Sequence, residues 1–406
     1  MIKETKNLTI KPGYKKTPIG IIPEEWVVKN FGDFLEFKNG VNASKKDYGK
    51  GVKFINVLEV ITNLSLTNEE IPGEVEITEK QFERYKVEKG DILFNRTSET
   101  QEEIALSSVY LDDYPTVFGG FVIRGRFIKD FYLNAFKKYI FRNPDVRKQM
   151  ISKGQGAVRV NIGQSDLEKI STPIPPLPEQ KAIADCLSTW DKGIEKLTAL
   201  IQSKKEQKKG LMQGFFSGKL KVENGELIQA KEKEDFTEDW EEVRLKDIAN
   251  IKKGKQLNRK KLNDFDKYPS YSGGITPSGF TNKSNCKSNT IIISEGGNSC
   301  GYVNFINVDF WLGGHCYAVN EYKERAIKRF LYNILKHNQP KIMVLRVGSG
   351  LPNVQKGDLE KFKLKLPNLK VQTAIAGVLT TADKEIELLE NKLSAFQTQK
   401  KGLMQV

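Results

Sequence analysis

The sequence is poor in the residues that build most metal and nucleophile sites. Its 406 residues include four cysteines, at positions 186, 286, 300 and 316, and two histidines, His315 and His337. Because no two cysteines have CxxC spacing, we expect neither a disulfide framework nor a zinc site. His315 adjoins Cys316, and we interpret the two as a packed pair rather than as metal ligands. The scattered thiols fit a reducing cytoplasm.

Long apolar stretches and catalytic motifs are missing as well. The run Ile291–Ile293 indicates a buried strand, and no stretch approaches the roughly 18–20 apolar residues that cross a bilayer. Residues 1–12 have no apolar core typical of a signal peptide. The sequence contains no GxxxxGK[S/T] phosphate loop, and residues 143–145 lack the second proline and the aromatic of an adenine methyltransferase motif. We therefore expect a cytoplasmic protein that is not itself an enzyme and holds no metal or cofactor.

Positive charge is present in excess. The chain has 65 Lys and Arg against 51 Asp and Glu, a formal net charge of +14. Lysines and arginines that neutralise phosphates release counterions from a nucleic acid, which favours binding. The excess therefore favours a nucleic-acid partner, although many soluble proteins are basic too. The length favours two or three domains.

The sequence contains an internal repeat. Residues 180–213 align without a gap with residues 372–405, at an offset of 192, and Asn161 recurs at the same offset as Asn353. Nearer the N-terminus, Trp26 matches Trp240 at an offset of 214. The second copy is therefore shorter by 22 residues in its middle. We infer that one scaffold carries two different working surfaces.

The repeated segments have the apolar spacing of coiled coils, with alternating steps of four and three residues. Lys208 and Lys400 occupy equivalent positions of this seam, and a parallel arrangement would bring their ammonium groups together. We therefore predict two long antiparallel helices, rather than two amphipathic helices of a globular core. The seam residues are Ile183, Leu187, Trp190, Ile194, Leu197 and Ile201 in the first helix, and Ile375, Leu379, Ile386, Leu389, Leu393 and Phe396 in the second.

The segment before each helix mixes short strand-like runs with one helical stretch, so the predicted fold class is α+β with a pseudo-twofold internal repeat. The predicted strands are 52–57, 91–94 and 117–123 in the first copy and 289–294 and 317–319 in the second, with helices near 132–141 and 325–336. The predicted organisation is an N-terminal arm (1–21), a first domain (22–172), a first helix segment (173–219), a linker (220–236), a second domain (237–364) and a second helix segment (365–406).

Loops in both domains are rich in side chains that bind phosphates and base edges. Arginine and lysine pair with guanine, and asparagine and glutamine pair with adenine. A single such residue is more often a solvated surface residue, so only the clusters indicate binding. The candidates are Lys38, Asn39, Asn42, Ser44, Lys45, Lys46, Asn95, Arg96, Thr97, Ser98, Gln155, Arg159 and Asn161 in the first domain. In the second domain they are Lys252, Lys253, Lys255, Gln256, Arg259, Lys260, Lys261, Tyr271, Ser272, Asn298, Arg346, Ser349 and Asn353.

The order of short motifs resembles that of specificity subunits of type I restriction-modification systems, over nearly the whole chain. The motifs are YKKTPIG at 14–20 with IPEEW at 22–26, GDILF at 90–94, PPLPEQ at 175–180, and KGLMQ at 209–213 with FSGKL at 216–220. The second copy departs from this pattern, because Val371 stands where Glu179 precedes the glutamine, and no FSGK follows its KGLMQ.

The resemblance implies two target-recognition domains that each read one half of an asymmetric bipartite DNA site in the major groove. It also implies that the helices set the gap between the halves and dock two methyltransferase subunits, which restriction subunits can join. S-adenosylmethionine, ATP and Mg would then be used by these partners and not by this chain. The residues alone also allow a stand-alone regulator that binds bipartite DNA, or a coiled-coil adaptor without restriction-modification partners.

Overall fold

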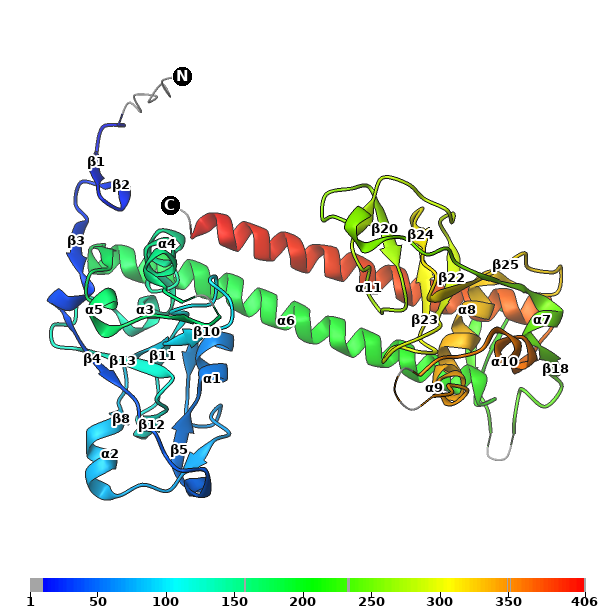
Figure 1. The fold of residues 1–406 in the computed structure, drawn as a ribbon, viewed down its shortest axis with the longest axis horizontal. Helices are drawn as coiled ribbons and strands as arrows, with labels where there is room; N and C mark the ends of the chain where they lie inside the picture. Colours follow the sequence, from blue (N-terminus) through cyan, green and yellow to red (C-terminus); the bar gives the residue numbers. More distant parts are fainter. Residues whose placement is uncertain (1–9, 157, 232–233, 349, 351, 405–406) are drawn as a thin grey trace. The chain divides into compact units, whose positions relative to one another are not determined.

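The computed structural model describes residues 10–156, 158–231, 234–348, 350 and 352–404. The chain divides into two compact units: unit 1 contains residues 1–195 and 394–406, and unit 2 contains residues 196–393. The division falls within two long helices, α6 (Leu177–Phe216) and α11 (Leu369–Leu403), so each unit holds a part of both (Figure 1). No helix in the described part of the chain is long and apolar enough to cross a membrane.

Unit 1 contains two main sheets. The first has the order β4-β13-β9-β11-β6, and the second has the order β7-β5-β12-β8. The strands of the first are β4 (Leu35–Asn39), β6 (Ser65–Leu66), β9 (Ile92–Asn95), β11 (Ser107–Tyr110) and β13 (Val122–Phe127). Those of the second are β5 (Tyr48–Ile55), β7 (Glu74–Val75), β8 (Lys86–Val87) and β12 (Thr116–Phe118).

Short strand pairs and helices complete unit 1. The pairs are β1 (Tyr14–Thr17) with β2 (Gly20–Pro23), β3 (Val27–Asn30) with β15 (Ser171–Ile174), and β10 (Thr97–Ser98) with β14 (Val160–Asn161). The helices are α1 (Val57–Thr62), α2 (Glu79–Tyr85), α3 (Asn134–Ile140), α4 (Pro144–Lys153) and α5 (Gln164–Leu167), with 3-10 turns η1 (Phe31–Asp33) and η2 (Lys45–Asp47).

Aromatic rings fill the core of unit 1. Phe31, Phe94 and Phe141 are almost wholly buried, and the ring of Phe31 lies 5.1 Å from that of Phe141 and 6.0 Å from that of Phe94. Tilted and edge-to-face rings at such distances add attraction beyond the apolar area that they bury. Ala184 and Leu187 of α6 belong to the same cluster. The first turns of α6 are therefore part of the domain core.

Unit 2 repeats the plan of unit 1 in a smaller form. Its sheets have the orders β19-β25-β22-β23 and β21-β20-β24. The strands are β19 (Asn250–Lys253), β20 (Tyr268–Tyr271), β21 (Phe280–Thr281), β22 (Thr290–Ser294), β23 (Val303–Ile306), β24 (Trp311–Leu312) and β25 (Cys316–Asn320). β18 (Glu241–Arg244) pairs with β26 (Lys363–Leu366). The helices are α7 (Leu245–Ile248), α8 (Lys328–His337), α9 (Gln339–Val344) and α10 (Lys356–Lys361), with the turn η3 (Arg259–Lys261).

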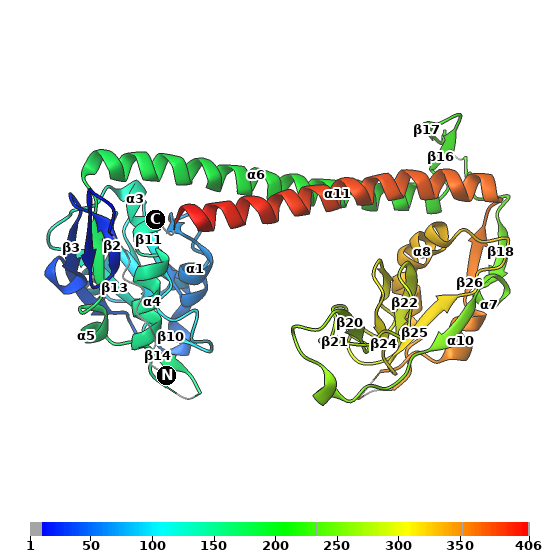
Figure 2. The same cartoon turned by 90° about the horizontal axis from the view of Figure 1, so that it is seen from above.

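The segment that we predicted to be a linker contains a hairpin. β16 (Leu220–Glu223) pairs with β17 (Glu226–Gln229), as Figure 2 shows. Asn224 and Gly225 form its turn, both with positive φ, which suits asparagine and glycine. The sequence did not predict this hairpin, because only β16 (LKVE) alternates apolar and polar residues while β17 (ELIQ) does not, and many charged residues surround both.

The strand pairings show where the two copies differ in length. Val122 pairs with Asn95 in unit 1, as Cys316 pairs with Ser294 in unit 2. The offset thus falls from 214 at Gly40 and Gly254 to 199 at Asn95 and Ser294. Most of the missing residues belong to the stretch that holds α1 and α2 in unit 1. The predicted shortening in the middle of the second domain is confirmed.

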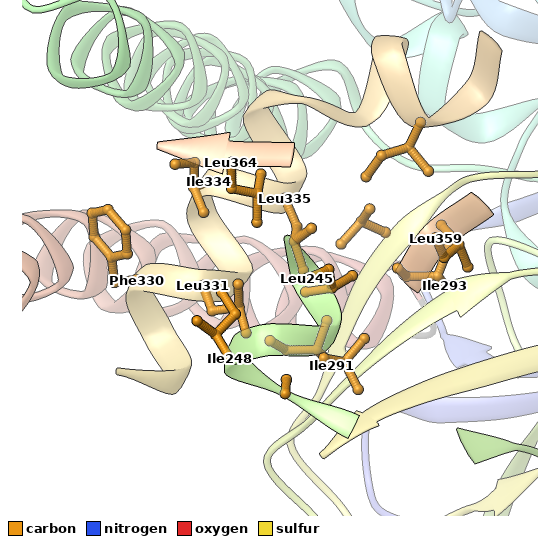
Figure 3. Close-up of a cluster of buried hydrophobic side chains, with 14 of the residues drawn as sticks. Leu245, Ile248, Ile291, Ile293, Phe330, Leu331, Ile334, Leu335, Leu359 and Leu364 are labelled. Carbon is orange, nitrogen blue, oxygen red and sulfur yellow. The ribbon is translucent and has the colours of Figure 1, made fainter. Parts of the chain in front are cut away.

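The core of unit 2 lies between α7, α8 and the central strands. Figure 3 shows Leu331 and Leu335 of α8 beside Leu245 and Ile248 of α7, with Ile291 of β22 next to them. Residues four apart lie on one face of a helix, so the apolar spacing of α8 gives it one buried face. This spacing made the helix predictable near residues 325–336, and α8 spans Lys328–His337.

The segments of α6 and α11 run antiparallel in each unit. In unit 2, Lys204 pairs with Glu385 and Lys208 with Asp383, so the later residue of α6 pairs with the earlier residue of α11. In unit 1, Lys400 pairs with Asp191. Lys208 and Lys400 are repeat equivalents, as are Asp191 and Asp383, so the same ion pair occurs twice. The predicted antiparallel arrangement is confirmed.

The predicted seam is buried or partly buried along its length. The buried members are Leu187, Leu197, Ile201, Ile375, Leu379 and Ile386, and the partly buried members are Ile183, Trp190, Ile194, Leu389, Leu393 and Phe396. The rings of Trp190 and Phe396 meet edge to face at 5.2 Å within unit 1.

A buried glutamine joins each long helix to its domain. The Gln180 side chain accepts a hydrogen bond from Leu133 N at 2.9 Å and donates to Phe131 O and Pro175 O, both at 2.8 Å. Its equivalent in unit 2, Gln372, has the corresponding backbone partners just before α8 and α11. Both glutamines are 0% exposed. A buried amide with every strong hydrogen bond satisfied fixes one geometry, because any other would leave these groups unpaired.

We expect Gln180→Met to lower the free energy of unfolding of unit 1 by about 2–4 kcal/mol, because one buried and two partly buried backbone groups lose their partner. Urea unfolding of the full chain measures this loss. The matched control is Gln397→Met, at an exposed position of α11 in the same unit, which should change stability by less than about 0.5 kcal/mol. Equal losses for both variants would refute the role of Gln180.

Lys336, near the end of α8, is held in a poorly solvated position. Its ammonium group donates to Val303 O and Gln339 Oε1, both at 2.8 Å, and lies over the Tyr302 ring. These partners are uncharged, and burial lowers the pKa of Lys336 from 10.5 to about 8, with a further contribution from Lys208. The folded protein therefore releases this proton at a lower pH than the unfolded chain does.

The pKa of Lys336 predicts a pH dependence of stability. Between about pH 8 and 10.5 the unfolded chain binds this proton more tightly, so stability should rise with pH in this window. We expect the unfolding free energy of the wild type, relative to Lys336→Met, to be constant below pH 8 and to increase above it. Urea unfolding from pH 7 to 10.5 tests this, with the exposed Lys384→Met as control. A difference that does not vary with pH would contradict the prediction.

Candidate DNA interface

In unit 1, strand register gathers the predicted loops at one end of the first sheet. Asn39 at the end of β4 pairs with Ile123, and Ile123 pairs on its other side with Phe94 near the end of β9. Asn39, the turn after β9 and the loop before β13 therefore lie together. The pairing of Thr97 with Asn161 adds the loop that follows α4.

Polar contacts order these loops. Arg96 Nη1 donates to Gly120 O at 3.1 Å, and the amide oxygen of Asn42 packs so close to Gly120 that a Cβ there would clash. Thr97 Oγ1 donates to Asn161 Oδ1 at 2.7 Å. Arg96 uses one guanidinium nitrogen for the backbone and is only partly buried, and a guanidinium has further N–H donors. The cluster is ordered before any ligand arrives.

Two predicted contact residues of unit 1 face inward instead. Asn95 is 1% exposed and Ser98 is 6% exposed. Asn95 Nδ2 donates to Glu103 O and its Oδ1 accepts from Thr97 N, while Ser98 Oγ donates to Glu103 Oε2. These bonds shape the turn after β9, so the prediction that Asn95 and Ser98 contact DNA directly is wrong for this structure. Both position their neighbours Arg96 and Thr97.

The other candidates of unit 1 lie at the surface. Asn39, Asn42, Gln155, Arg159 and Asn161 are exposed, and Lys38 is partly buried. Ser44, Lys45 and Lys46 are also exposed, but they belong to the turn η2 before β5 of the second sheet. Strand register does not bring this basic turn to the end of the first sheet.

Unit 2 gathers its loops in the same way. Lys253 at the end of β19 pairs with Tyr317, which pairs on its other side with Ile293 of β22. Gly296 and Val347 both bridge to Asn353, which adds the loop after α9. The amide oxygen of Gln256 packs against Gly314. The arrangement repeats that of unit 1 with other side chains.

A buried carboxylate lies at this end of unit 2. Glu295 is 4% exposed, and its Oε1 accepts from Lys253 Nζ at 2.6 Å and from Tyr317 OH at 2.7 Å. His315 Nδ1 lies 3.9 Å from the other carboxylate oxygen. The pKa of Tyr317 is raised, first by burial and then by the hydrogen bond to Glu295. Lys253, predicted to contact DNA, is thus committed at least in part to Glu295.

The remaining candidates of unit 2 fall into two groups. Lys252, Lys255, Gln256, Asn298 and Arg346 are exposed, as are Arg259, Lys260 and Lys261 on the turn η3. Tyr271, Ser272 and Asn353 are partly buried, and the Tyr271 ring packs edge to face on Phe310. Ser349 lies outside the described residues.

Three residues of these surfaces were not predicted. Phe121, 62% exposed, follows Gly119-Gly120, and the exposed His315 follows Gly313-Gly314 at the equivalent place before the next strand. Because a Gly-Gly pair precedes both Phe121 and His315, the sequence alone could have indicated these two residues as equivalent surface positions. Glu295 occupies the position of Arg96, since Ile162 N donates to Arg96 O as Val354 N donates to Glu295 O. Neither repeat offset found in the sequence, 192 or 214, relates Arg96 to Glu295, because these positions differ by 199.

Comparison with known proteins gives consistent matches. The family model described as type I restriction modification DNA specificity domain matches residues 23–205 and 237–396. A putative type I restriction enzyme specificity subunit of Methanocaldococcus jannaschii is 27% identical over 96% of this chain and 94% of its own length. A second type I specificity subunit of the same organism is 24% identical over 94% of this chain and 92% of its own length.

Solved structures share the fold. The S subunit of a type I restriction-modification system from M. genitalium matches with a TM-score of 0.58 at 19% identity, over 94% of this chain and 95% of that chain. A structure from work on complex assembly and conformational transition of the type I R-M system matches with a TM-score of 0.55 at 15% identity, over 94% and 97% of the two chains. At these identities the matches concern the fold alone.

The neighbours Lys252 and Lys253 allow a structural role to be separated from a surface role. We expect Lys253→Met to lower the free energy of unfolding by about 1–3 kcal/mol, because the buried Glu295 carboxylate loses its cationic partner. Lys252→Met, at an exposed position of the same strand, should stay within about 0.5 kcal/mol of the wild type. Thermal unfolding without DNA measures both. A loss of stability in Lys252→Met as large as that in Lys253→Met would contradict this assignment.

Proposed function

Because the chain belongs to the family of type I restriction-modification DNA specificity domains, we propose that it selects the DNA sequence on which a type I complex acts. The first domain reads one half of a bipartite site and the second domain reads the other half. The chain contributes recognition, and the chemistry belongs to its partner subunits.

The observation that supports an asymmetric site is the difference between equivalent positions of the two domains. Arg96 in unit 1 corresponds to Glu295 in unit 2, and Phe121 corresponds to His315. The backbone plan is shared, while the side chains at equivalent strand ends differ: Arg96 is partly exposed, whereas Glu295 is buried and holds Lys253. Two surfaces that differ in this way prefer different bases, so the two half-sites differ in sequence.

General readout chemistry suggests a role for each kind of side chain. The remaining N–H groups of Arg96 match the acceptors of guanine, and amides such as Asn42 and Gln256 match adenine. The exposed Phe121 ring suits the methyl group of thymine or an unstacked step. Exposed lysines such as Lys252 and Lys255 suit backbone phosphates, which hold the protein in register and carry no sequence information.

The two long helices suit a second role, that of setting the gap between half-sites and docking partners. α6 has 40 residues and α11 has 35, and both are continuous through the division between the units. The partners would be two methyltransferase subunits, which use S-adenosylmethionine, and restriction subunits, which use ATP and Mg. A continuous helix resists bending, so the unread gap should have one length.

We expect co-expression with a cognate methyltransferase subunit to yield modified adenines in one bipartite motif with a constant gap. Inserting one heptad after both Ala199 and Asn391, which are repeat equivalents, keeps the seam and lengthens each helix by about 10 Å. The gap should then grow by about 3 base pairs, with both half-sites unchanged. Single-molecule sequencing of modified DNA measures both properties.

A matched control places seven residues in the β16–β17 turn, between Asn224 and Gly225, which lengthens neither helix. The motif and its gap should remain those of the wild type. Modified motifs without a constant gap would overturn the proposal as a whole. An unchanged gap after the heptad insertion would remove the role of the helices and leave base recognition standing.

A further inference from the structure

Four side chains of unit 2 form a polar network at one end of its four-stranded sheet. The carboxylate of Glu295 lies at the centre, where Oε1 accepts from Lys253 Nζ at 2.6 Å and from Tyr317 OH at 2.7 Å. The other oxygen, Oε2, lies 3.9 Å from His315 Nδ1. The Glu295 side chain is 5% exposed, whereas that of His315 is 58% exposed. The network therefore connects a buried charge to a side chain at the surface.

The equivalent positions of unit 1 carry side chains of a different kind. Strand pairing and the Gly-Gly turns place Asn39, Arg96, Phe121 and Ile123 there. Phe121 and Ile123 have no hydrogen-bonding side-chain atoms, and Arg96 donates to the main chain. In unit 2 a buried carboxylate thus occurs together with three side chains that can donate to it. Lys253 compensates the charge, which would be costly to bury alone, so the burial of this charge does not require the exposed His315.

The main chain holds His315 next to the carboxylate. Glu295 N donates to His315 O at 2.8 Å, so the two residues are joined through their backbones as well. Gly273 approaches from a neighbouring loop with φ +90°, and a Cβ there would lie 3.3 Å from His315 Cβ. Glycine suits such a conformation and such a close approach. The backbone of His315 is therefore set in place before any ligand arrives.

We propose that His315 reads one base of the half-site that unit 2 contacts, and that Glu295 is the positioning residue that keeps the proton of this ring on Nδ1. The inference rests on the proposed function of the chain. A neutral imidazole carries one proton, so one nitrogen donates and the other accepts. The negative oxygen beside Nδ1 stabilises a proton there. Nε2 then carries the lone pair and accepts a hydrogen bond.

A base that is read by an acceptor must present a donor. In the major groove, adenine offers its N6 amino group and cytosine its N4 amino group. Guanine N7 and O6 and thymine O4 are acceptors, which would face the lone pair of Nε2 without a proton between them. His315 therefore selects an exocyclic amino group at one position. Phe121, its equivalent in unit 1, has no acceptor and cannot make this selection.

The position of the proton can be measured in the full-length chain without DNA. The chain has two histidines, His315 and His337, so 15N-histidine labelling gives two imidazole spectra, which His315→Phe assigns. At pH 8.5, where an imidazole is ordinarily uncharged, the nitrogen chemical shifts should place the His315 proton on Nδ1. Glu295→Gln keeps the shape of the side chain and removes its charge, so it should move part of this proton to Nε2. The signals of His337 should not change.

The base contact is tested with the complex of the chain and its methyltransferase subunits, on DNA that contains the motif found by sequencing. Each adenine of the motif is replaced in turn by unsubstituted purine, and each cytosine by 2-pyrimidinone, which lack the amino group. At one position, the loss of affinity should be about tenfold larger for the wild type than for His315→Phe, because one hydrogen bond is lost. At all other positions, both proteins should lose the same factor. Phenylalanine is the matched replacement, because unit 1 carries an exposed Phe121 at the equivalent place.

The outcomes separate the two parts of the proposal from the proposed function. A wild-type proton on Nε2, or the same proton distribution in Glu295→Gln, overturns the positioning role of Glu295. Equal losses for the wild type and His315→Phe at every position overturn the base contact and leave the proposed function standing. A complex that modifies no bipartite motif refutes the proposed function and the base contact with it, while the nitrogen spectra of the chain alone still test Glu295.

Discussion

In each unit, an ion pair between a lysine of one long helix and an aspartate of the other fixes how the helices meet. Asp191 is half-buried, and burial alone would raise its pKa, but hydrogen bonds from Lys400 and Tyr139 outweigh burial and leave the pKa below its usual value. The carboxylate therefore stays charged and paired. A shift by one heptad, or parallel pairing, would leave a charge without its partner between apolar side chains, which is costly.

A second contact in each unit joins a long helix to its own domain. The buried glutamine near the start of each helix bonds the main chain just before α3 or α8. The helix start then enters the domain core, where Ala184 and Leu187 pack in unit 1 and Ile375 and Leu379 pack in unit 2. Each long helix is thus held to the other by the ion pair and to its domain by the glutamine and these apolar side chains.

Much of this architecture could be predicted from the sequence, because its signals are local and periodic. The antiparallel helices could be predicted from the apolar seam, the offset of 192 and the equivalence of Lys208 and Lys400. The apolar runs of β9 and β22 were sufficient for the central strands. The equivalence of Arg96 and Glu295 was not predictable, because it depends on strand pairing after insertions have changed the offset. The sequence also did not predict that Asn95 and Ser98 face inward. The same polar residues suit both a binding loop and a hydrogen-bonded turn.

The hydrogen bonds of Gln180 and Gln372 are made entirely to main-chain atoms. Such bonds are indifferent to the side chains that the bonded loop carries. A recognition segment of another sequence therefore fits the same helix, provided that its backbone follows the same path before α3 or α8. Exchange of whole segments between related chains would then alter the preferred bases in one step, with the strut left intact. The attachment itself makes the domains interchangeable parts.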